Sequence, residues 1–288
     1  MSAAPATSEP RPRLVVEVRS GARRGAKVSV DPGGTLRVGR AGRADLVIAE
    51  DASLSPVHCE LAWDGETCRL RDLGSAAGTT LGGAPLDGAG VVKHGGWLRA
   101  GETTLSVHVE ARSPLRGSGA VDAQRADEAL AALAPRVGRL HAILDTARDA
   151  RVAELLAESV DESRSLYEGA EDEVLADVAP QLVAFRAGSA LLERLVRAGW
   201  GRSFGVFVES DASFKALRRH LRRFLMVDEA DTGRRMYFRF YDPRVLRAFL
   251  PLATARQRDE LFADVIARFV CEGAHGGLLA FDATEAAS

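Results

Sequence analysis

The sequence predicts two domains, an all-β sandwich followed by a mixed α/β domain. In residues 13–110, short apolar runs recur about every ten residues with Gly, Pro and Asp between them, which is typical of antiparallel strands. In residues 137–282, strand-length apolar runs alternate with helical patterns, which favours an α/β fold. Residues 111–136 begin with Ser, Pro and Gly, as a flexible linker does.

Composition indicates a globular protein of the cytoplasm. Of the 288 residues, 46% are hydrophobic and 27% are charged, which is normal for a chain with buried cores. The sequence has no run of 18 apolar residues, so no membrane span is predicted. Residues 1–12 are expected to be a disordered tail without a secretory signal, and residues 283–288 a short C-terminal tail. Three cysteines lack the spacing of a disulfide framework or a zinc site, so we expect a reducing compartment and no metal.

The first domain is predicted strand by strand from its apolar runs. They have strand length, and none has helical periodicity. In chain order they are LVVEV, AKVSV, TLRVG, DLVI, HCELAW, TCRLRDL, GGWLRA and TTLSVHVE.

Two loops of this domain carry a recognisable pattern. Gly39-Arg40 is followed by Ser55-Pro56-Val57-His58, and then by the segment Asp72–Thr79. This order and spacing resemble the forkhead-associated (FHA) domain over about residues 14–109. The resemblance implies phosphothreonine recognition, with the Arg40 guanidinium and the Ser55 hydroxyl donating to phosphate oxygens. It also implies residues that support the loops, which are Gly39, His58, Ser75 and Gly78.

The loops depart from the family's pattern at three positions. Pro56 stands where a basic or amide side chain is usual, and Ala76 and Ala77 replace a threonine and an asparagine. Each lost hydrogen bond costs about 1–3 kcal/mol. Arg24, Arg43 and Arg71 are candidates to compensate. Two functions therefore stay open for this domain, phosphothreonine binding and phosphate-independent protein interaction.

The second domain is predicted as helices and strands in alternation. A helix ends near Pro135, and another contains Leu140, Ile143, Leu144 and Ala147 on one face. Val152, Leu155 and Leu156 mark either its continuation or a separate helix. PQLVAF and FGVFVES are strands around the helix ALLERLVRAG, and GLLAF is the last strand. Thr254 and Gln257 form a capping box. The helix that this box opens has Leu261, Phe262, Val265, Ile266, Phe269 and Val270 on its apolar face.

The stretch from Ser213 to Leu250 is the most basic part of the chain. Between Lys215 and Arg247 it has ten basic and four acidic residues, although the whole chain has a net charge of −2. Ser213 caps a helix whose apolar stripe is Phe214, Leu217, Leu221 and Phe224. After a turn at residues 231–233, alternation predicts a strand with Met236, Phe238 and Phe240 on one face and Arg235, Tyr237, Arg239 and Tyr241 on the other.

The motifs of this stretch carry a second resemblance. HLRRFL followed by FRFYDPRVLRAFLP resembles the type VI secretion effector-adaptor family, also called Tap or TEC chaperones, as do LDTARDARVAELL, SLYEG with APQLVAF, and the Gly-Trp-Gly before FGVFVES. The resemblance covers nearly all of residues 137–281. It implies a protein without enzymatic activity that binds a toxic effector and helps to load it onto the VgrG spike. For the FHA-like module, the implied partner is a threonine-phosphorylated protein or a Ser/Thr kinase.

Arginine beside tyrosine is common at protein interfaces. We therefore predict partner binding by Arg218, Arg219, Arg222, Arg223, Arg239 and Tyr241. Asp242, Pro243 and Arg244 are expected to be architectural, because aspartate followed by proline starts a helix. His220 is expected to be structural.

No constellation of catalytic residues is present, and no motif for a cofactor occurs, so neither an enzyme nor a cofactor is expected. Two alternatives to the secretion adaptor remain. One is a phosphothreonine-dependent signalling scaffold outside secretion. The other is a nucleic-acid-binding protein that uses the arginine-rich residues 215–247.

Overall fold

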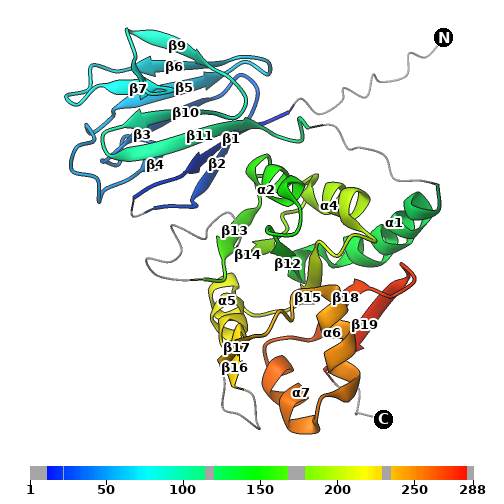
Figure 1. Cartoon of the computed structure of the whole chain (residues 1–288). Coiled ribbons are helices and arrows are strands. Elements are labelled where there is room, and N and C mark those ends of the chain that lie inside the picture. The colour runs from blue at the N-terminus through cyan, green and yellow to red at the C-terminus, as the bar shows by residue number, and fades with distance from the viewer. Residues whose placement is uncertain (1–11, 22, 114–119, 168–178, 229–234, 284–288) are drawn as a thin grey trace, which may run out of the picture. The chain divides into compact units, whose positions relative to one another are not determined.

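A computed structural model describes residues 12–21, 23–113, 120–167, 179–228 and 235–283 (Figure 1). The chain divides into two compact units. The first contains residues 1–112 with 157–160, and the second contains residues 113–156 with 161–288. Among the described residues, no helix is long and apolar enough to cross a membrane.

The first unit is a sandwich of two sheets, as predicted. One sheet has the order β2-β1-β11-β10-β7-β8 and the other β4-β3-β5-β6-β9, and every described pairing except β3 with β4 is antiparallel. The strands are β1 (Leu14–Val18), β2 (Lys27–Val30), β3 (Thr35–Gly39), β4 (Leu46–Val47), β5 (Cys59–Trp63), β6 (Cys68–Asp72), β7 (Thr79–Leu81), β8 (Ala84–Pro85), β9 (Ala89–Val92), β10 (Gly96–Ala100) and β11 (Thr103–Val109).

Alternation along the strands places the core between the two sheets. In β5, Cys59, Leu61 and Trp63 are buried while the residues between them are less so. Strands β7, β8 and β9 were not predicted, because they are only two to four residues long and none has more than two consecutive apolar residues. The all-β sandwich is nonetheless confirmed.

The second unit is a six-stranded antiparallel sheet with helices on both faces, which confirms a mixed α/β domain. The strand order is β13-β14-β12-β15-β18-β19. Its strands are β12 (Leu140–Asp145), β13 (Glu162–Ser165), β14 (Pro180–Ala184), β15 (Gly205–Glu209), β18 (Arg268–Glu272) and β19 (Leu278–Asp282), with a separate hairpin of β16 (Met226–Asp228) and β17 (Arg235–Tyr237).

Two apolar cores cover the two faces of this sheet. Helices α1 (Ala120–Leu133), α2 (Ala150–Ala157) and α4 (Leu191–Gly199) pack on one face, against Leu144 and Phe207 among others. Helices α5 (Phe214–Arg222), α6 (Pro243–Phe249) and α7 (Ala255–Phe262) pack on the other, against Ile143 and Val206. Figure 1 shows these helices on opposite sides of the sheet. Short 3₁₀ helices, η1 (Ala134–Arg139) and η2 (Leu250–Leu252), follow α1 and α6.

The helix predicted from Leu140, Ile143, Leu144 and Ala147 is wrong. Residues Leu140–Asp145 form the central strand β12, and all six are buried. A strand that is covered on both faces is apolar at nearly every position, so its pattern does not alternate and also fits a helix. Of the two alternatives for Val152, Leu155 and Leu156, the separate helix is correct, because these residues are the buried face of α2.

The helix opened by the capping box is shorter than predicted. Thr254 accepts from the backbone N–H of Gln257, and the capping box is present, but α7 ends at Phe262. Ala263 follows with a φ of 42°, which ends the helix. Phe269 and Val270 belong to β18 instead. Helix α7 and strand β18 both contribute apolar residues to neighbouring cores, so the apolar pattern of the sequence continues across the end of the helix.

The predicted strand through Tyr241 is also too long. Strand β17 ends at Tyr237, and the turn predicted at residues 231–233 lies outside the described residues. Phe240 and Tyr241 are both buried, with 0% and 6% exposure, so the two-face alternation does not extend to them. The caps on either side were predicted correctly: Ser213 caps α5, and Asp242 caps α6 with Pro243 in its first turn.

Candidate functional site

The first candidate site is the pair of loops that carries Arg40 and Ser55. The backbone N–H of Arg40 donates to the Ser55 carbonyl (3.1 Å), and that of Ala41 donates to the Pro56 carbonyl (3.2 Å). A Cβ on Gly39 would lie 2.3 Å from the Pro56 oxygen, so this close approach requires glycine. The sequence thereby places the two predicted phosphate ligands on adjacent, hydrogen-bonded backbone segments.

His58 joins these segments to the second predicted loop. It is fully buried, and its Nδ1 accepts a hydrogen bond from the Ser55 N–H (3.2 Å). Since Nδ1 accepts, the proton lies on Nε2, which donates to the Gly78 carbonyl (3.0 Å). The imidazole therefore holds the two loops at a fixed separation.

Asp72, at the end of β6, organises the second loop. Its carboxylate accepts from the hydroxyls of Ser75 and Thr79, both at 2.6 Å, and from the backbone N–H groups of Gly74 and Ser75, both at 3.0 Å. Burial acts to raise the pKa of Asp72, but these hydrogen bonds outweigh it and lower the pKa below the ordinary value. Asp72 and Thr79 were not among the site residues predicted from the sequence. An aspartate with serine three residues later, at a strand end, is the turn signal that could have found Asp72.

The end of the sandwich leaves two donors available to a ligand. Ser55 Oγ accepts from the Ala76 N–H (3.1 Å), and its own hydroxyl proton is then free to donate outward. Arg40 is exposed, and its guanidinium has no hydrogen bond or ion pair with any described residue. Pro56, Ala76 and Ala77 are exposed around them and add no side-chain donor.

The three candidate compensating arginines are differently placed. Arg43 is exposed in the loop from β3 to β4, which also carries Arg40. Arg71 lies on the outer face of its sheet, next to the buried Leu70. Arg24 lies in the turn between β1 and β2. Only Arg43 shares a loop with the predicted ligands.

The second candidate site is the basic face of α5. Arg218 donates to the carbonyls of Ser165 (2.7 Å) and Tyr167 (2.9 Å), and Arg222 donates to the carbonyl of Leu166 (3.0 Å). These two arginines therefore bind the chain that follows β13. Arg219 and Arg223 are exposed, and the guanidinium of Arg223 lies 5.7 Å from the centre of the Phe224 ring.

Arg239 and Tyr241 form a cluster with Asp145, the last residue of β12, and with Tyr167, which follows β13. Arg239 makes an ion pair with Asp145, which is 1% exposed at the end of β12, and lies 5.8 Å from the centre of the Tyr241 ring. Burial acts to lower the pKa of Arg239, but the charge of Asp145 and the hydrogen bond to it raise the pKa. Burial raises the pKa of Tyr241, as does the nearby Tyr167.

The prediction that Tyr241 contacts a partner needs correction. Its side chain is 6% exposed and packs edge to face on Phe240 at 5.8 Å, because the strand ended four residues earlier. Asp242 is 2% exposed and accepts from the backbone N–H (2.9 Å), Nε (3.0 Å) and Nη2 (2.6 Å) of Arg244. Burial acts to raise the pKa of Asp242, but these bonds lower it. With Pro243 in the first turn, Asp242 and Arg244 start α6.

The same contacts argue against nucleic-acid binding by residues 215–247. Phosphate binding needs several unengaged cations on one surface. Here Arg218 and Arg222 bind backbone carbonyls, while Arg239 and Arg244 are paired with carboxylates. Within the described part of this stretch, the exposed cations without such contacts are Lys215, Arg219 and Arg223.

His220 is structural, as the sequence suggested. It is 6% exposed, and its Nε2 lies 2.7 Å from the Leu261 carbonyl, which ties α5 to α7. Burial lowers the pKa of this imidazole.

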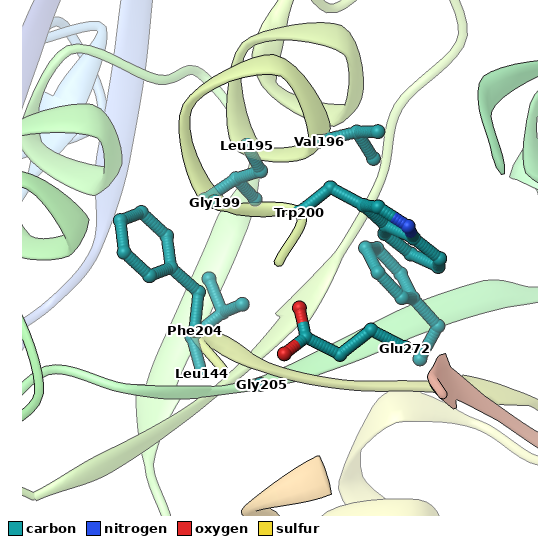
Figure 2. Close-up of a pocket in the computed structure, with 9 residues that line it drawn as sticks. Leu144, Leu195, Val196, Gly199, Trp200, Phe204, Gly205 and Glu272 are labelled. Carbon is teal, nitrogen blue, oxygen red and sulfur yellow. The ribbon is translucent and has the colours of Figure 1, made fainter. Parts of the chain in front are cut away.

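A small cavity beside α4 does not have the dimensions of a substrate site (Figure 2). Its volume is about 20 Å³, which is room for about one water molecule. Glu272 faces it and accepts from the N–H of Gly201 (2.6 Å) and from the N–H and hydroxyl of Ser203 (both 3.0 Å). The carboxylate thus fixes the turn after α4. No group of three metal-binding side chains occurs within the described ranges.

Comparison with known families identifies both domains. Residues 140–260 match the model of DUF4123, a domain of unknown function, and residues 17–111 match that of the cytoplasmic domain of an inner membrane component of type III secretion. Over 76 residues, 26% of this chain, the sequence is 36% identical to an FHA domain-containing protein of Arabidopsis thaliana, and it spans only 20% of that relative. The chain joins an FHA domain to a DUF4123 domain. Both sequence resemblances are confirmed.

Solved FHA domains are also similar to the first unit. The FHA domain of the CT664 protein from Chlamydia trachomatis is 26% identical, over 33% of this chain and 96% of that one, with a TM-score of 0.32. The FHA domain of an Arabidopsis thaliana hypothetical protein is 29% identical, over 40% of this chain and all of that one, with a TM-score of 0.35.

Proposed function

We propose that this protein is a non-enzymatic adaptor of type VI secretion in the cytoplasm. Its DUF4123 domain binds an effector and helps to load it onto the VgrG spike, and its FHA domain recognises a phosphothreonine on a secretion component or a Ser/Thr kinase. The adaptor function is supported by the match of residues 140–260 to DUF4123, the domain of unknown function that corresponds to the type VI effector-adaptor family whose motifs the sequence carries. The engagement of the arginines of α5 and α6 within the fold favours it over nucleic-acid binding.

The observation that carries the phosphothreonine proposal is the assembled end of the sandwich. Buried His58 and the carboxylate of Asp72 hold both loops through side-chain hydrogen bonds, so little ordering is needed when a ligand binds. Arg40 and Ser55 supply one cationic and one neutral donor from adjacent backbone. This is the donor pair that a phosphate dianion would need.

Three missing side chains set the expected strength of this binding. Pro56, Ala76 and Ala77 offer no side-chain hydrogen bond to a peptide, so sequence selectivity around the phosphate is expected to be weak. Binding then depends mostly on Arg40. We expect affinity in the range of transient signalling contacts rather than that of a permanent complex.

A titration of phosphothreonine peptides against the full chain tests this site. We expect Arg40→Ala to weaken binding at least tenfold, since a hydrogen bond to a charged group contributes about 1.5–3 kcal/mol. Arg69→Ala is the matched control, because Arg69 is an exposed arginine on β6, away from both loops. If the wild-type chain binds the phosphorylated peptides no better than unphosphorylated ones, the phosphothreonine proposal is wrong.

Affinity purification of the tagged chain from its own cells, followed by mass spectrometry, tests the adaptor function. We expect to recover a VgrG spike protein together with a toxin. Repeating the purification with Arg40→Ala separates the two domains, since effector and spike should persist while phosphorylated partners are lost. Recovery of neither a spike protein nor a toxin would count against the adaptor.

A further inference from the structure

The six-stranded sheet of the second unit ends at β19, an edge strand that is apolar except for its last residue (Figure 1). Among the described strands, β19 pairs with β18 alone, from Leu278 to Asp282. Leu278 is 40% exposed, and Ala280 is partly exposed. An apolar edge strand of this kind is a template for pairing with a further strand.

Hydrogen bonds at the two ends of β19 establish which of its backbone groups point away from β18. At one end, the N–H of Gly273 donates to the carbonyl of Gly277 (2.7 Å), and at the other the N–H of Ala283 donates to the carbonyl of Ala267 (3.0 Å). An antiparallel ladder alternates, so every second residue between Gly277 and Ala283 also bonds to β18. The residues between those have outward N–H and C=O groups, and they are Leu278, Ala280 and Asp282.

The contacts of these three outward residues agree with that alternation. The Asp282 carbonyl accepts from Nη2 of Arg258 (3.1 Å), a group of α7 and not of β18. The backbone groups of Leu278 and Ala280 have no hydrogen bond to any described residue. N–H and C=O groups at every second residue match the spacing of another extended strand, so the ligand of this edge is a strand.

The order of side chains in β19 is complementary to a second copy of itself. Two copies that run antiparallel about Ala280 pair outward groups with outward groups, which places Leu278 of one copy opposite Asp282 of the other. On the other face of the sheet, Leu279 then lies opposite Phe281, and both are apolar. Asp282 is the charged residue of β19, and it does not meet its own copy. No like charges therefore oppose the pairing.

An arginine lies near the place that the aspartate of the second copy would take. A Cβ on Gly276 would lie 2.9 Å from Cδ and Nη1 of Arg125, a residue of α1 whose guanidinium has no hydrogen bond or ion pair with any described residue. In the antiparallel register, Asp282 of the second copy is diagonal to Gly276, at a separation that long side chains span. Asp282 bonds Arg268 through Oδ1 (2.5 Å), and its Oδ2 has no bond to a described residue. That oxygen can accept from Arg125.

We infer that two copies of this protein pair through β19, antiparallel about Ala280, so that one sheet continues across both DUF4123 domains. Contact through a single short strand buries little surface, so the dimer is reversible. The inference goes beyond the proposed function and does not rest on it.

Sedimentation velocity of the full chain over a range of concentrations tests the dimer. We expect the mass of the wild type to rise with concentration from one chain towards two. Ala280→Pro should stay monomeric, because it removes an outward N–H and no bond to β18. Leu278→Asp should weaken dimerisation about tenfold, because it sets like charges opposite each other on both sides of the axis. Leu252→Asp is the matched control at an exposed leucine of η2, and it should dimerise as the wild type does.

Hydrogen exchange of the wild type assigns the contact to β19. As concentration rises, exchange should slow at the amides of Leu278 and Ala280, which have no partner in the monomer. Urea midpoints of Ala280→Pro and Leu278→Asp, measured on dilute chains, should stay near that of the wild type. Loss of the dimer in these variants is then not loss of the fold.

Four outcomes would overturn this inference. One is a chain that stays monomeric at every concentration, and another is a dimer in which the amides of Leu278 and Ala280 still exchange fast. A dimer that Leu252→Asp abolishes as fully as Leu278→Asp does would use another surface. A monomer in which the two amides slow only in a co-purified complex would assign β19 to a strand of that other protein.

Discussion

The loop end of the FHA domain and the basic face of the DUF4123 domain use charged groups in opposite ways. In the FHA domain, a buried histidine and an aspartate fix the backbone, and Arg40 is left exposed. In the DUF4123 domain, arginines of α5 themselves fix the backbone, and Ala248 of α6 and Leu252 of η2 are left exposed. Density of charge is therefore a poor guide to the binding surface. What matters is which side chains already have partners.

Among the variants that test this comparison, Arg239→Ala is expected to lose the most folding stability. Removal of this arginine leaves the carboxylate of Asp145 buried without its cation. We expect the free energy of unfolding to fall by about 3 kcal/mol, which is the low end for a broken buried ion pair because Arg239 is itself half-exposed. Urea unfolding of the full chain measures the loss, with hydrogen exchange to assign the transition to its domain. Arg223→Ala, which removes an exposed arginine, should change stability by less than about 0.5 kcal/mol. Equal losses would show that the ion pair is not structural.

His58→Ala should have the next largest effect. It leaves the Ser55 N–H and the Gly78 carbonyl without their partner and opens a cavity, so we expect a loss of about 2 kcal/mol in the FHA domain. The same unfolding measurement applies. Arg40→Ala is the control and should leave the stability unchanged while phosphopeptide binding falls. A destabilised Arg40→Ala variant would mean that Arg40 is part of the scaffold.

Arg218→Ala and Arg219→Ala form a neighbouring pair with different expected effects. Arg218 donates to two carbonyls, so its loss should cost about 1–2 kcal/mol, whereas Arg219 is exposed and its loss should be near zero. Thermal unfolding of the two variants side by side measures this difference. If Arg219→Ala were the more destabilising variant, Arg218 would not be the arginine that holds residues 165–167 through its hydrogen bonds.

The smallest effect concerns acid stability. Because the pKa of Asp72 is lower in the folded chain, its contribution is complete above the unfolded value near 4 and is lost as the pH falls through the folded pKa. Asp72→Asn removes this titrating group, so the part of the acid-induced loss of stability that is due to Asp72 should disappear. The variant should also be less stable than the wild type at neutral pH, by about 1 kcal/mol, because the hydrogen bonds to the carboxylate are weakened. Urea midpoints from pH 7 to pH 3 measure this, with Asp45→Asn as the exposed control. Parallel curves for wild type and Asp72→Asn would contradict it.

Most of the fold could be predicted because local patterns and packing agree. Turn residues between apolar runs marked the sandwich, and Ser213, Asp242 and Thr254 marked three helix starts that the structure has. The failures lie where burial removes the pattern. Strand β12 is covered on both faces, so nothing in Leu140–Asp145 distinguishes it from a helix. At the end of α7, helix and strand are both apolar, and the break at Ala263 leaves no residue-type signal.

The candidate sites show the same limit. The FHA loops could be located from Gly39, Ser55 and His58 because the motif has fixed spacing, but the role of Asp72 depends on hydrogen bonds with residues three and seven positions further along the chain. Among the arginines of α5, the sequence does not distinguish Arg218 from Arg219. Which of the two meets a carbonyl depends on where residues 165–167 pass, and that is decided by the pairing of β13 with β14, which lie far from α5 in the sequence.

The engagement of Arg218 and Arg222 also bears on aggregation. Strand β13 is the outermost strand of its sheet, and an open sheet edge can pair with the same edge of another molecule. Three consecutive carbonyls at the end of this strand, from Ser165 to Tyr167, already accept from the two guanidinium groups. Each guanidinium also places bulk and positive charge there, which repels an identical edge. The arginines that look like a binding surface in the sequence thus occupy carbonyls at the end of an edge strand, where another strand could otherwise pair.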